Sequence, residues 1–394
     1  MSAPCYLNAL GLVCAIGRDH ATVAQRAFAA DSGIVLRAQY SRTGTVPVGP
    51  VESPLPSLGD YAIALRSRNN QLALVAAEQL CADVNDAVER FGAERVAVVV
   101  GTSTSGIGES ERAIRALSAD GHLPASFHPE QQEMGSLARF LSTTLGVRGP
   151  SFVHSSACAS GAKAMASAAR LLRMGLADAV VTGGVDSLCT FTIAGFASLG
   201  LVSTSRCNPF SVNRDGINIG EAAALFLMTR EPATVQLRGW GESSDGHHFS
   251  APDPSGRGAR FAIEAALARA SLTASDIEYV NLHATGTRAN DVMEGAVVHA
   301  LFGDAVAVSG TKPLTGHTLG AAGALEAALC WLTMQDGNDV GRLPPHLWDG
   351  EADPAIAPLH FVGVSERLGR PPRATMSTSF AFGGANAALV FVRD

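Results

Sequence analysis

The chain has 394 residues, of which 47% are hydrophobic and 16% are charged, and its formal net charge is −7. This length accommodates two packed units with a large common core, and the composition is typical of a tightly packed α/β protein rather than a disordered or fibrous one. The negative charge gives no support for a nucleic-acid partner. No apolar run reaches about 18 residues, so we expect no membrane span.

The cysteines indicate the compartment. There are seven of them, an odd number, without a CxxC pair. Five lie among small apolar residues, as buried thiols do: Cys5, Cys14, Cys81, Cys189 and Cys330. This pattern fits a reducing compartment better than a disulfide framework. The first 17 residues lack a basic segment ahead of their apolar residues, so we expect no signal peptide and a cytoplasmic protein.

Strand-like runs alternate with alanine-rich helical stretches along the chain. The clearest runs are 95–101, 179–183, 279–283 and 305–309. This alternation predicts a mostly parallel sheet with helices on both faces. The composition changes around 231–236, so we predict a first half at residues 1–233 and a second half at 234–394.

Two internal echoes indicate a duplicated unit. Cys158 and His317 each follow an apolar strand, and each is followed by glycine three residues later and by an alanine pair at positions ten and eleven. In addition, Gly101-Thr-Ser-Thr in the first half matches Ala284-Thr-Gly-Thr in the second. Two echoes in the same order predict two related α/β halves, with Cys158 and His317 at matching strand-to-helix corners. The small residues predict that both following helices are buried on all sides.

Cys158 stands at such a corner, in Ser155-Ser-Ala-Cys158-Ala-Ser-Gly161. A cysteine chosen at random is most often an inert buried residue. Here the start of a helix offers free N–H groups that favour a thiolate and can stabilise an oxyanion. We therefore predict that Cys158 is an exposed nucleophile at a sharp turn.

Two histidines share the corner positions. His283 ends a strand, and His317 opens a helix. Either one alone is more often a hydrogen-bonded structural residue, but together with Cys158 they suit acyl chemistry, because two imidazole N–H donors can hold a carbonyl as it becomes an enolate. Metal binding is the rival use. No HxxxH or HxH pair is present, which disfavours metal catalysis.

Two further features point to the same site. Of the 29 basic residues only Lys163 and Lys312 are lysines, which indicates that Lys312 is needed as a compact ammonium near the histidines and Glu326. The loop at 377–386 contains two consecutive glycines. It is either an ordinary turn or a mobile loop beside the thiol, in which Phe382 supplies a backbone N–H and an aromatic gate.

These segments, in this order, resemble the β-ketoacyl-acyl carrier protein synthases of the decarboxylating I/II class, members of the thiolase superfamily. The resemblance covers essentially the whole chain. Its motifs are Cys158-Ala-Ser-Gly161, Asn208-Pro-Phe with Arg214-Asp-Gly, His283-Ala-Thr285-Gly-Thr287, Thr311-Lys312-Pro-Leu-Thr-Gly-His317 and Phe380-Ala-Phe382-Gly-Gly.

The resemblance implies a thiolase-like, five-layered αβαβα fold of two duplicated halves, with a dimer interface through the sheet edge. It implies that Cys158 takes an acyl group from an acyl carrier protein, with the backbone N–H groups of Cys158 and Phe382 as the oxyanion hole. His283 and His317 would polarise a malonyl thioester, so that carbon dioxide leaves and the carbanion attacks the acyl group.

The same resemblance assigns supporting residues. Lys312 would act through Glu326, and Thr285 and Thr287 would bind the phosphopantetheine arm that carries the substrates; no other cofactor is implied. Some relatives hold a structural cation near the positions of Asn281, Glu326, Ser377 and Thr378. The candidates for a basic patch facing an acidic carrier protein are Arg66, Arg68 and Arg206, which are otherwise solvated surface residues.

Several departures from the family pattern indicate a specialised branch. Ala284 and Ala381 replace glycines, the segment 126–135 is polar where relatives cap an apolar acyl pocket, and the loop 101–106 is rich in hydroxyls. The chain resembles the synthases of aryl-polyene pathways, which work beside a cysteine-lacking partner subunit. Ordinary fatty-acid elongation is the alternative, and either a homodimer or a heterodimer fits.

Three other classes are less consistent with the residues. A thiolase needs a second cysteine near the C-terminus, and none follows Cys330. A class III initiating synthase has asparagine in place of one histidine. A non-catalytic chain-length partner lacks the nucleophile, although a weakly active subunit can retain it.

Overall fold

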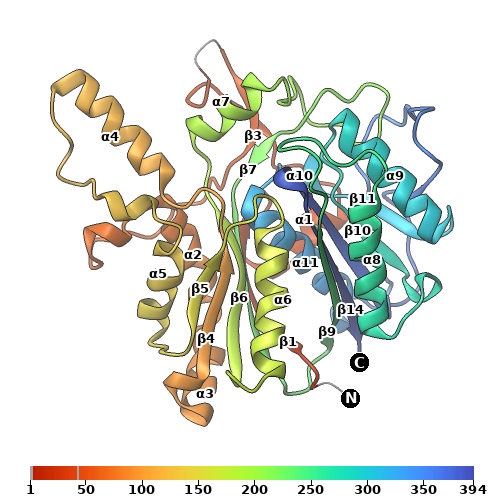
Figure 1. Ribbon diagram of the computed structural model, residues 1–394, viewed down its shortest axis with the longest axis horizontal. Helices are drawn as coiled ribbons and strands as arrows, with labels where there is room; N and C mark the ends of the chain where they lie inside the picture. The colour runs from red at the N-terminus through yellow and green to blue at the C-terminus, as the bar shows by residue number, and fades with distance from the viewer. Residues whose placement is uncertain (1–2, 42–43) are drawn as a thin grey trace.

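Long buried strands and small-residue helices form the framework of the molecule, shown in Figure 1 as a computed structural model that describes residues 3–41 and 44–394. The strands of the first half are β1 (Tyr6–Cys14), β4 (Val96–Gly101), β5 (Ser151–His154), β6 (Ala179–Asp186) and β8 (Ala222–Thr229). Those of the second half are β9 (Val235–Ser244), β10 (Tyr279–Leu282), β11 (Ala307–Gly310), β12 (His360–Phe361), β13 (Ala374–Ala381) and β14 (Ala385–Arg393).

The two halves repeat one strand order. The first half runs β5-β4-β6-β8-β1, and the second runs β11-β10-β13-β14-β9 with β12 added outside β11. In each, three strands are parallel and the last two are antiparallel to their neighbours. Within the described residues the half-sheets meet where β1 pairs with β9 at a single position, Tyr6 with Gln236. This repetition confirms the predicted duplication.

Helices cover both half-sheets in layers. The helices are α1 (His20–Phe28), α2 (Arg68–Glu78), α3 (Cys81–Phe91), α4 (Ile107–Asp120), α5 (Ser136–Leu145), α6 (Ser160–Arg173), α7 (Thr190–Ser198), α8 (Arg257–Ala270), α9 (Arg288–Phe302), α10 (Lys312–Thr315) and α11 (Ala322–Thr333). Three core clusters separate the layers: one holds α6 and α11 between the half-sheets, one lies under α2, α3 and α5, and one lies under α8 and α9. Read from left to right in Figure 1, the layers are αβαβα, as expected.

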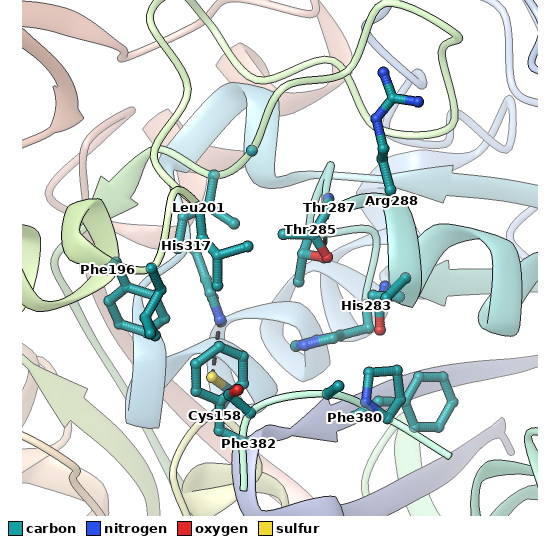
Figure 2. Close-up of a pocket in the computed structure, with 18 of the residues that line it drawn as sticks. Cys158, Phe196, Leu201, His283, Thr285, Thr287, Arg288, His317, Phe380 and Phe382 are labelled. Atoms are coloured by element: carbon teal, nitrogen blue, oxygen red, sulfur yellow. Dashed lines mark hydrogen bonds between the residues drawn. The ribbon is translucent and has the colours of Figure 1, made fainter. Parts of the chain in front are cut away.

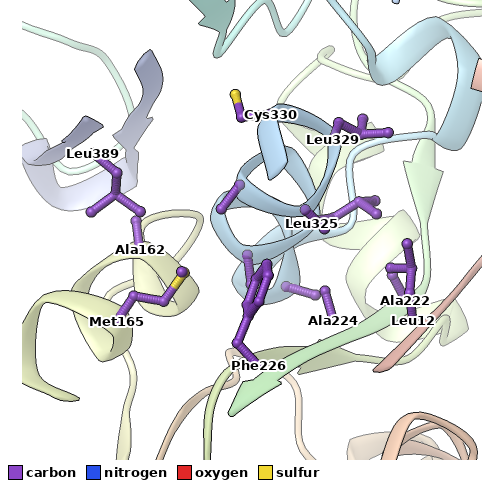
Figure 3. Close-up of a cluster of buried hydrophobic side chains, with 14 of the residues drawn as sticks. Leu12, Ala162, Met165, Ala222, Ala224, Phe226, Leu325, Leu329, Cys330 and Leu389 are labelled. Atoms are coloured by element: carbon purple, nitrogen blue, oxygen red, sulfur yellow. The ribbon is translucent and has the colours of Figure 1, made fainter. Parts of the chain in front are cut away.

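Small residues allow α6 and α11, the two helices of the central layer, to pack closely together. A Cβ atom added to Gly161 of α6 would lie 3.0 Å from the backbone nitrogen of Ala324 in α11, and one added to Gly323 would lie 2.9 Å from the Cβ of Ala162. The two helices therefore approach closely. The prediction that both are buried on all sides is met by α11, of which only Trp331 is not buried, but it is wrong for α6, because Arg170 is exposed and Lys163 and Ser167 on the same stripe are half-buried. Ala162, Leu325 and Phe226 belong to this central cluster, and Figure 3 shows them around α11.

The central helices begin at equivalent corners. Cys158 lies between β5 and α6, and His317 lies between α10 and α11. The residue before each one has a left-handed backbone: φ is +47° at Ala157 and +74° at Gly316. Such a turn is rare for alanine, and it presents the following side chain at the ends of the strands.

The remaining elements close the structure around this end of the sheets. A small sheet contains β2 (Val35–Arg37), β3 (Val46–Gly49) and β7 (Ile219–Gly220), in the order β2-β3-β7. The boundary placed between residues 233 and 234 falls in the connection from β8 to β9. No helix in the described part of the chain is long and apolar enough to cross a membrane.

Candidate active site

Three side chains from separate segments meet at the corners. The Nε2 atom of His317 lies 2.9 Å from the Sγ atom of Cys158, and the rings of His283 and His317 stand edge to face with centroids 5.4 Å apart. All three residues are buried, and Figure 2 shows them around the floor of one pocket. The corner after β5, the end of β10 and the turn after α10 thus converge on one point.

The backbone of each histidine is fixed by neighbouring polar groups. The His317 N–H donates to the Asn218 carbonyl over 2.6 Å, and its own carbonyl accepts from the Gly220 N–H over 2.9 Å. The N–H groups of His283 and Ala284 donate to the two carboxylate oxygens of Glu294, over 2.7 and 2.8 Å. Glu294 is fully buried and was not singled out from the sequence.

Lys312 lies against the back of His283. Its Nζ atom is 3.4 Å from the His283 Nδ1 atom, and it also donates to the His283 carbonyl and to Glu326. A donor beside Nδ1 favours the imidazole tautomer that carries its proton on Nε2. His283 therefore presents an N–H donor to the pocket, and Lys312 and Glu326 lie together behind this histidine.

Burial sets the protonation of the site. Desolvation raises the pKa of the Cys158 thiol to about 12. The Asp186 charge also raises this pKa, whereas the Lys312 charge lowers it. Burial, together with the Lys312 charge, holds the pKa values of His283 and His317 well below 6.5. The resting pair is a neutral thiol and a neutral imidazole. The expectation that the Cys158 side chain is exposed is therefore wrong, because the residue is buried, and this burial disfavours the thiolate.

The loop after β13 closes the site from one side. The Phe382 N–H lies within hydrogen-bonding reach of Cys158, and the Phe382 ring contacts the Phe196 ring at 5.3 Å between centroids. The loop turns through Gly383 and Gly384, whose φ angles are +80° and +74°. Ala381, in contrast, has a φ of −101°, so this position does not require the glycine that is usual in the family.

Two pockets meet at Cys158. One, of about 430 Å³, opens past Thr285, Thr287 and Arg288. The other, of about 490 Å³, has a mainly apolar lining between α4 and α7. The residues that line both pockets are Cys158, Phe196, Leu199 and Phe382. The thiol is thus reached from either side, and the two phenylalanine rings stand between the compartments.

The entrance pocket contains both predicted threonines. The hydroxyls of Thr285 and Thr287 lie 2.9 Å apart, and both residues line the pocket with the exposed Arg288 next to them (Figure 2). Arg288 was not predicted. Its only signal in the sequence is its place directly after the second threonine, which carries no weight in a chain with many arginines.

The other predicted residues are placed differently. Asn281 and Ser377 pair across β10 and β13, the Thr378 hydroxyl donates to the Asn281 carbonyl, and Glu326 Oε2 has no hydrogen-bond partner in the described part of the chain. Oxygen atoms are the ligands that a hard cation prefers. The polar segment 126–135 does not line the apolar pocket; it contributes to a separate surface pocket beside Arg66.

The three arginines do not form one free patch. Arg66 and Arg206 are exposed. Arg68 is half-buried, and its Nε atom donates over 2.8 Å to Glu221, which is fully buried. The expectation that Arg68 offers a free charge to a carrier protein is therefore wrong, because a buried carboxylate already holds it.

A metal ion is the other possible use of Cys158, His283 and His317, whose potential ligand atoms lie within 4.8 Å of one another. A sulfur and a nitrogen on one tetrahedral zinc would stand about 3.5 Å apart, given bonds of about 2.3 and 2.0 Å. The 2.9 Å separation of Cys158 and His317 is shorter than that and matches direct contact. The geometry therefore favours a proton-transferring pair.

Comparison with known proteins decides the family. Residues 63–233 match the family described as "Beta-ketoacyl synthase, N-terminal domain", and residues 234–346 match "Beta-ketoacyl synthase, C-terminal domain". The chain belongs to the β-ketoacyl synthase family. It is thus a β-ketoacyl-acyl carrier protein synthase, an acyltransferase that catalyses a condensation.

Relatives of this β-ketoacyl synthase include Nodulation protein E of Rhizobium leguminosarum bv. trifolii, 31% identical over 98% of both chains. Another is 3-oxoacyl-[acyl-carrier-protein] synthase 2 of Staphylococcus aureus, 32% identical over 82% of this chain and 83% of that protein. A solved structure from Xenorhabdus doucetiae, of the ketosynthase ApeO in complex with its chain length factor ApeC, is 40% identical with a TM-score of 0.94, over 100% of this chain and 98% of the other.

Proposed function

We propose that this synthase joins an acyl group held on Cys158 to a malonyl unit on an acyl carrier protein, with loss of carbon dioxide, to give a 3-oxoacyl-acyl carrier protein. The observation that carries the proposal is the place of Cys158 at the junction of two pockets. A thioester arm entering past Thr285 and Thr287 reaches the sulfur from one side, and the apolar pocket accepts the acyl chain on the other.

Loading begins from the neutral pair. His317 Nε2 takes the proton of the Cys158 thiol, 2.9 Å away, as the sulfur attacks the incoming thioester carbonyl. The developing oxyanion accepts from the backbone N–H groups of Cys158 and Phe382. When the C–S bond to the carrier arm breaks, the His317 imidazolium returns its proton to the leaving thiolate. The acyl group remains on Cys158 and the histidine is neutral again.

Condensation uses the same groups on a second arm. Once Cys158 is acylated, the single proton of the neutral His317 ring moves from Nδ1 to Nε2 by tautomeric exchange. The Nε2–H groups of His283 and His317 then donate to the malonyl thioester carbonyl, which holds the electrons released when the C–C bond to the carboxylate breaks and carbon dioxide leaves. The resulting enolate carbon attacks the acyl carbonyl on Cys158. The C–S bond to Cys158 then breaks, and the freed thiolate takes a proton from water. The low pKa values of both histidines keep them neutral donors through this step.

Lys312 and Glu326 support this chemistry without touching the acyl chain. Lys312 holds the His283 carbonyl and the Nδ1 side of its ring, and Glu326 neutralises the ammonium in the buried site. The oxygen atoms of Asn281, Glu326, Ser377 and Thr378 would hold a structural cation, which would contact the Glu326 Oε2 atom that has no hydrogen-bond partner in the described part of the chain. Thr285 and Thr287 would hydrogen-bond the phosphopantetheine arm.

Aryl-polyene or related polyene synthesis is the pathway we propose. The relative described as ApeO is 40% identical over the whole chain, and the acyl pocket is bordered by Phe191, Phe196 and Phe382, flat rings that suit a conjugated chain. General fatty-acid elongation is the alternative, favoured by the 32% identical synthase from Staphylococcus aureus. A weakly catalytic chain-length partner is disfavoured by the contact between Cys158 and His317.

The partners we propose are an acyl carrier protein, which meets the exposed Arg66 and Arg206, and a second ketosynthase-like subunit. β5 is the outer strand of its half-sheet, with Phe152 38% exposed, and α4 projects from the body (Figure 1) with Ile114 62% exposed. On α7, Phe191 is 64% exposed. An open strand edge beside apolar helices suits either a second copy or a related chain.

The protein is therefore expressed alone and together with a chain-length partner, and the molar mass of each product is measured. A dimer formed by the protein alone indicates a homodimer, and a dimer formed only with the partner indicates a heterodimer.

Acyl transfer to Cys158→Ala tests the proposal. The wild-type protein, incubated with saturated, unsaturated and aryl acyl carriers, gains the acyl mass in intact-protein spectra, and C158A gains none while it remains folded. Equal loading of C158A would refute the assignment of the nucleophile. Addition of malonyl carrier then gives 3-oxoacyl products whose masses decide the pathway, because only aryl or polyenoyl primers are extended efficiently if the polyene proposal holds.

A further inference from the structure

Asp186 is a fully buried carboxylate at the end of β6 that the mechanism does not use. It accepts the hydroxyl protons of Thr102, Ser103 and Thr104 over 2.5, 2.5 and 2.8 Å. It also accepts the backbone N–H groups of Ser103, Thr104 and Gly320 over 2.9, 3.0 and 2.6 Å. No cation pairs with Asp186 in the described part of the chain. Dipoles alone thus stabilise its charge.

This arrangement explains the hydroxyl-rich loop at 101–106. The three hydroxyls are turned to Asp186 and not to an acyl chain, although Ser103 and Thr104 also border the apolar pocket. The hydroxyls therefore do not by themselves indicate an unusual substrate. They are the donors that make a lone buried carboxylate stable at this place.

The contact with Gly320 crosses between the halves of the molecule. Gly320 follows His317 by three residues, and it belongs to the second half, whereas Asp186 and its hydroxyl partners belong to the first. A Cβ atom on Gly320 would lie 2.7 Å from Asp186 Oδ2 and 2.6 Å from the Ser103 nitrogen. Only glycine allows this close approach.

The second half has a matching device. Glu294 accepts the N–H groups of His283 and Ala284, directly after β10. Asp186 accepts those of Ser103 and Thr104, directly after β4, the strand in the equivalent position. Each half thus clamps the same loop with a buried carboxylate. The clamp at Asp186 differs because it also reaches the segment that carries His317.

We propose that Asp186 is a positioning residue for the condensation: it ties the loop after β4 to the corner that carries His317 and so fixes that imidazole against Cys158. The inference rests on the proposed function. It acts through backbone geometry, because Asp186 touches neither the thiol nor the pocket floor. A displacement of about 1 Å at a reacting group lowers a rate about 100-fold.

Asp186→Asn is the test. The amide has the shape of the carboxylate, but its NH₂ group cannot accept a hydrogen bond. The hydroxyls of the loop can rotate away from this NH₂ group, whereas the backbone N–H of Gly320 is fixed and loses its acceptor. We expect acyl loading and condensation to slow about 100-fold. Because the Asp186 charge raises the pKa of Cys158, we also expect Cys158 to be alkylated by iodoacetamide at a lower pH in D186N than in the wild type.

Asp178→Asn is the matched control, since Asp178 is a carboxylate directly before the other end of β6 that binds Arg95 and Arg230. D178N should keep the wild-type rates and alkylation profile. Cys330 in α11 is fully buried, so its alkylation would show that the variant has lost its packing in general. Wild-type behaviour of D186N, equal losses in D178N, or alkylation of Cys330 together with Cys158 would each overturn the inference.

If D186N does not fold, Thr102→Val removes one donor without changing the charge, and a loss of rate in the same direction is expected; an unchanged rate overturns the inference. The alkylation profile needs no carrier protein. Failure of wild-type loading would therefore count against the proposed function, and failure of the pH shift would count against the role of Asp186.

Discussion

His317 Nε2 lies 2.9 Å from Cys158 Sγ, although the two residues stand 159 positions apart and come from opposite halves of the molecule. Both groups are neutral at rest, because burial raises the pKa of the thiol to about 12 and lowers that of the imidazole well below 6.5. In the proposed reaction, the attack of the Cys158 sulfur therefore depends on proton transfer within this pair and not on a preformed thiolate.

The first prediction concerns the pH dependence of loading. In the wild type the rate of acyl transfer to Cys158 should change little from about pH 6 to about pH 9, because the proton moves to His317 inside the pair. In His317→Ala the thiol must lose its proton to the solvent below its pKa of about 12, so the rate should rise about tenfold per pH unit. Intact-protein mass against time measures both. A flat profile in the variant contradicts the assignment of the base, and His299→Ala, on the surface of α9, is the control.

A second prediction separates the two histidines. His283→Ala should lower malonyl decarboxylation by about 100-fold or more, since one donor to the developing enolate is lost. It should lower loading of Cys158 much less, because His283 does not contact the thiol. Release of carbon dioxide and acyl loading are measured on the same samples. His283→Gln, which keeps an N–H donor, should recover part of the decarboxylation. Equal loss of both steps would count against this division of roles.

The buried pair of Lys312 and Glu326 gives a third prediction. Both side chains are nearly inaccessible to solvent, so Lys312→Met leaves an unpaired buried carboxyl and should lower the free energy of unfolding by about 3–5 kcal/mol. Glu326→Gln added to K312M should recover part of this loss, because no charge then remains to be buried. Urea unfolding of the two single variants and the double variant checks the coupling. Simply additive losses would show that the pair does not act as a unit.

Ala284 and Gly310 give a fourth prediction. Ala284 stands where the family usually has glycine, with a φ of +44°, and a Cβ atom on Gly310 would lie 2.3 Å from its methyl carbon. Gly310→Ala should therefore destabilise the protein by about 1–3 kcal/mol and slow condensation, because Ala284 adjoins His283. Ala284→Gly should restore both in the double variant. The thermal midpoint and the rate of product formation are the measurements, and a double variant no better than G310A would disprove the compensation.

Much of the fold could be predicted because it is repeated. The small-residue runs after Cys158 and His317 carry the signal of two helices packed closely together, and strand-like runs at regular intervals indicate the layers. The same two corners were predicted to carry Cys158 and His317, and the structure brings these two residues together. A duplicated unit thus supplies the same information twice, which makes even short motifs informative.

What the sequence could not supply depends on contacts between distant segments. The state of the Cys158 thiol follows from how completely neighbouring layers cover it, and this cannot be derived from the helix start alone. Arg68 resembles a surface charge until Glu221, 153 positions away, is found against it. Asp186 gave no signal, because a single aspartate at a strand end is common, and its significance lies in the donors gathered around it.

The repeated strand order also determines how the chain could be divided. The connection from β8 to β9 is short and lies between the halves, and the half-sheets are paired there at one position. A cut in this connection would leave the sulfur on one polypeptide and both imidazoles on the other, so neither fragment alone could form a carbon–carbon bond. Restored turnover on mixing the fragments would then report directly on docking through the layer of α6 and α11.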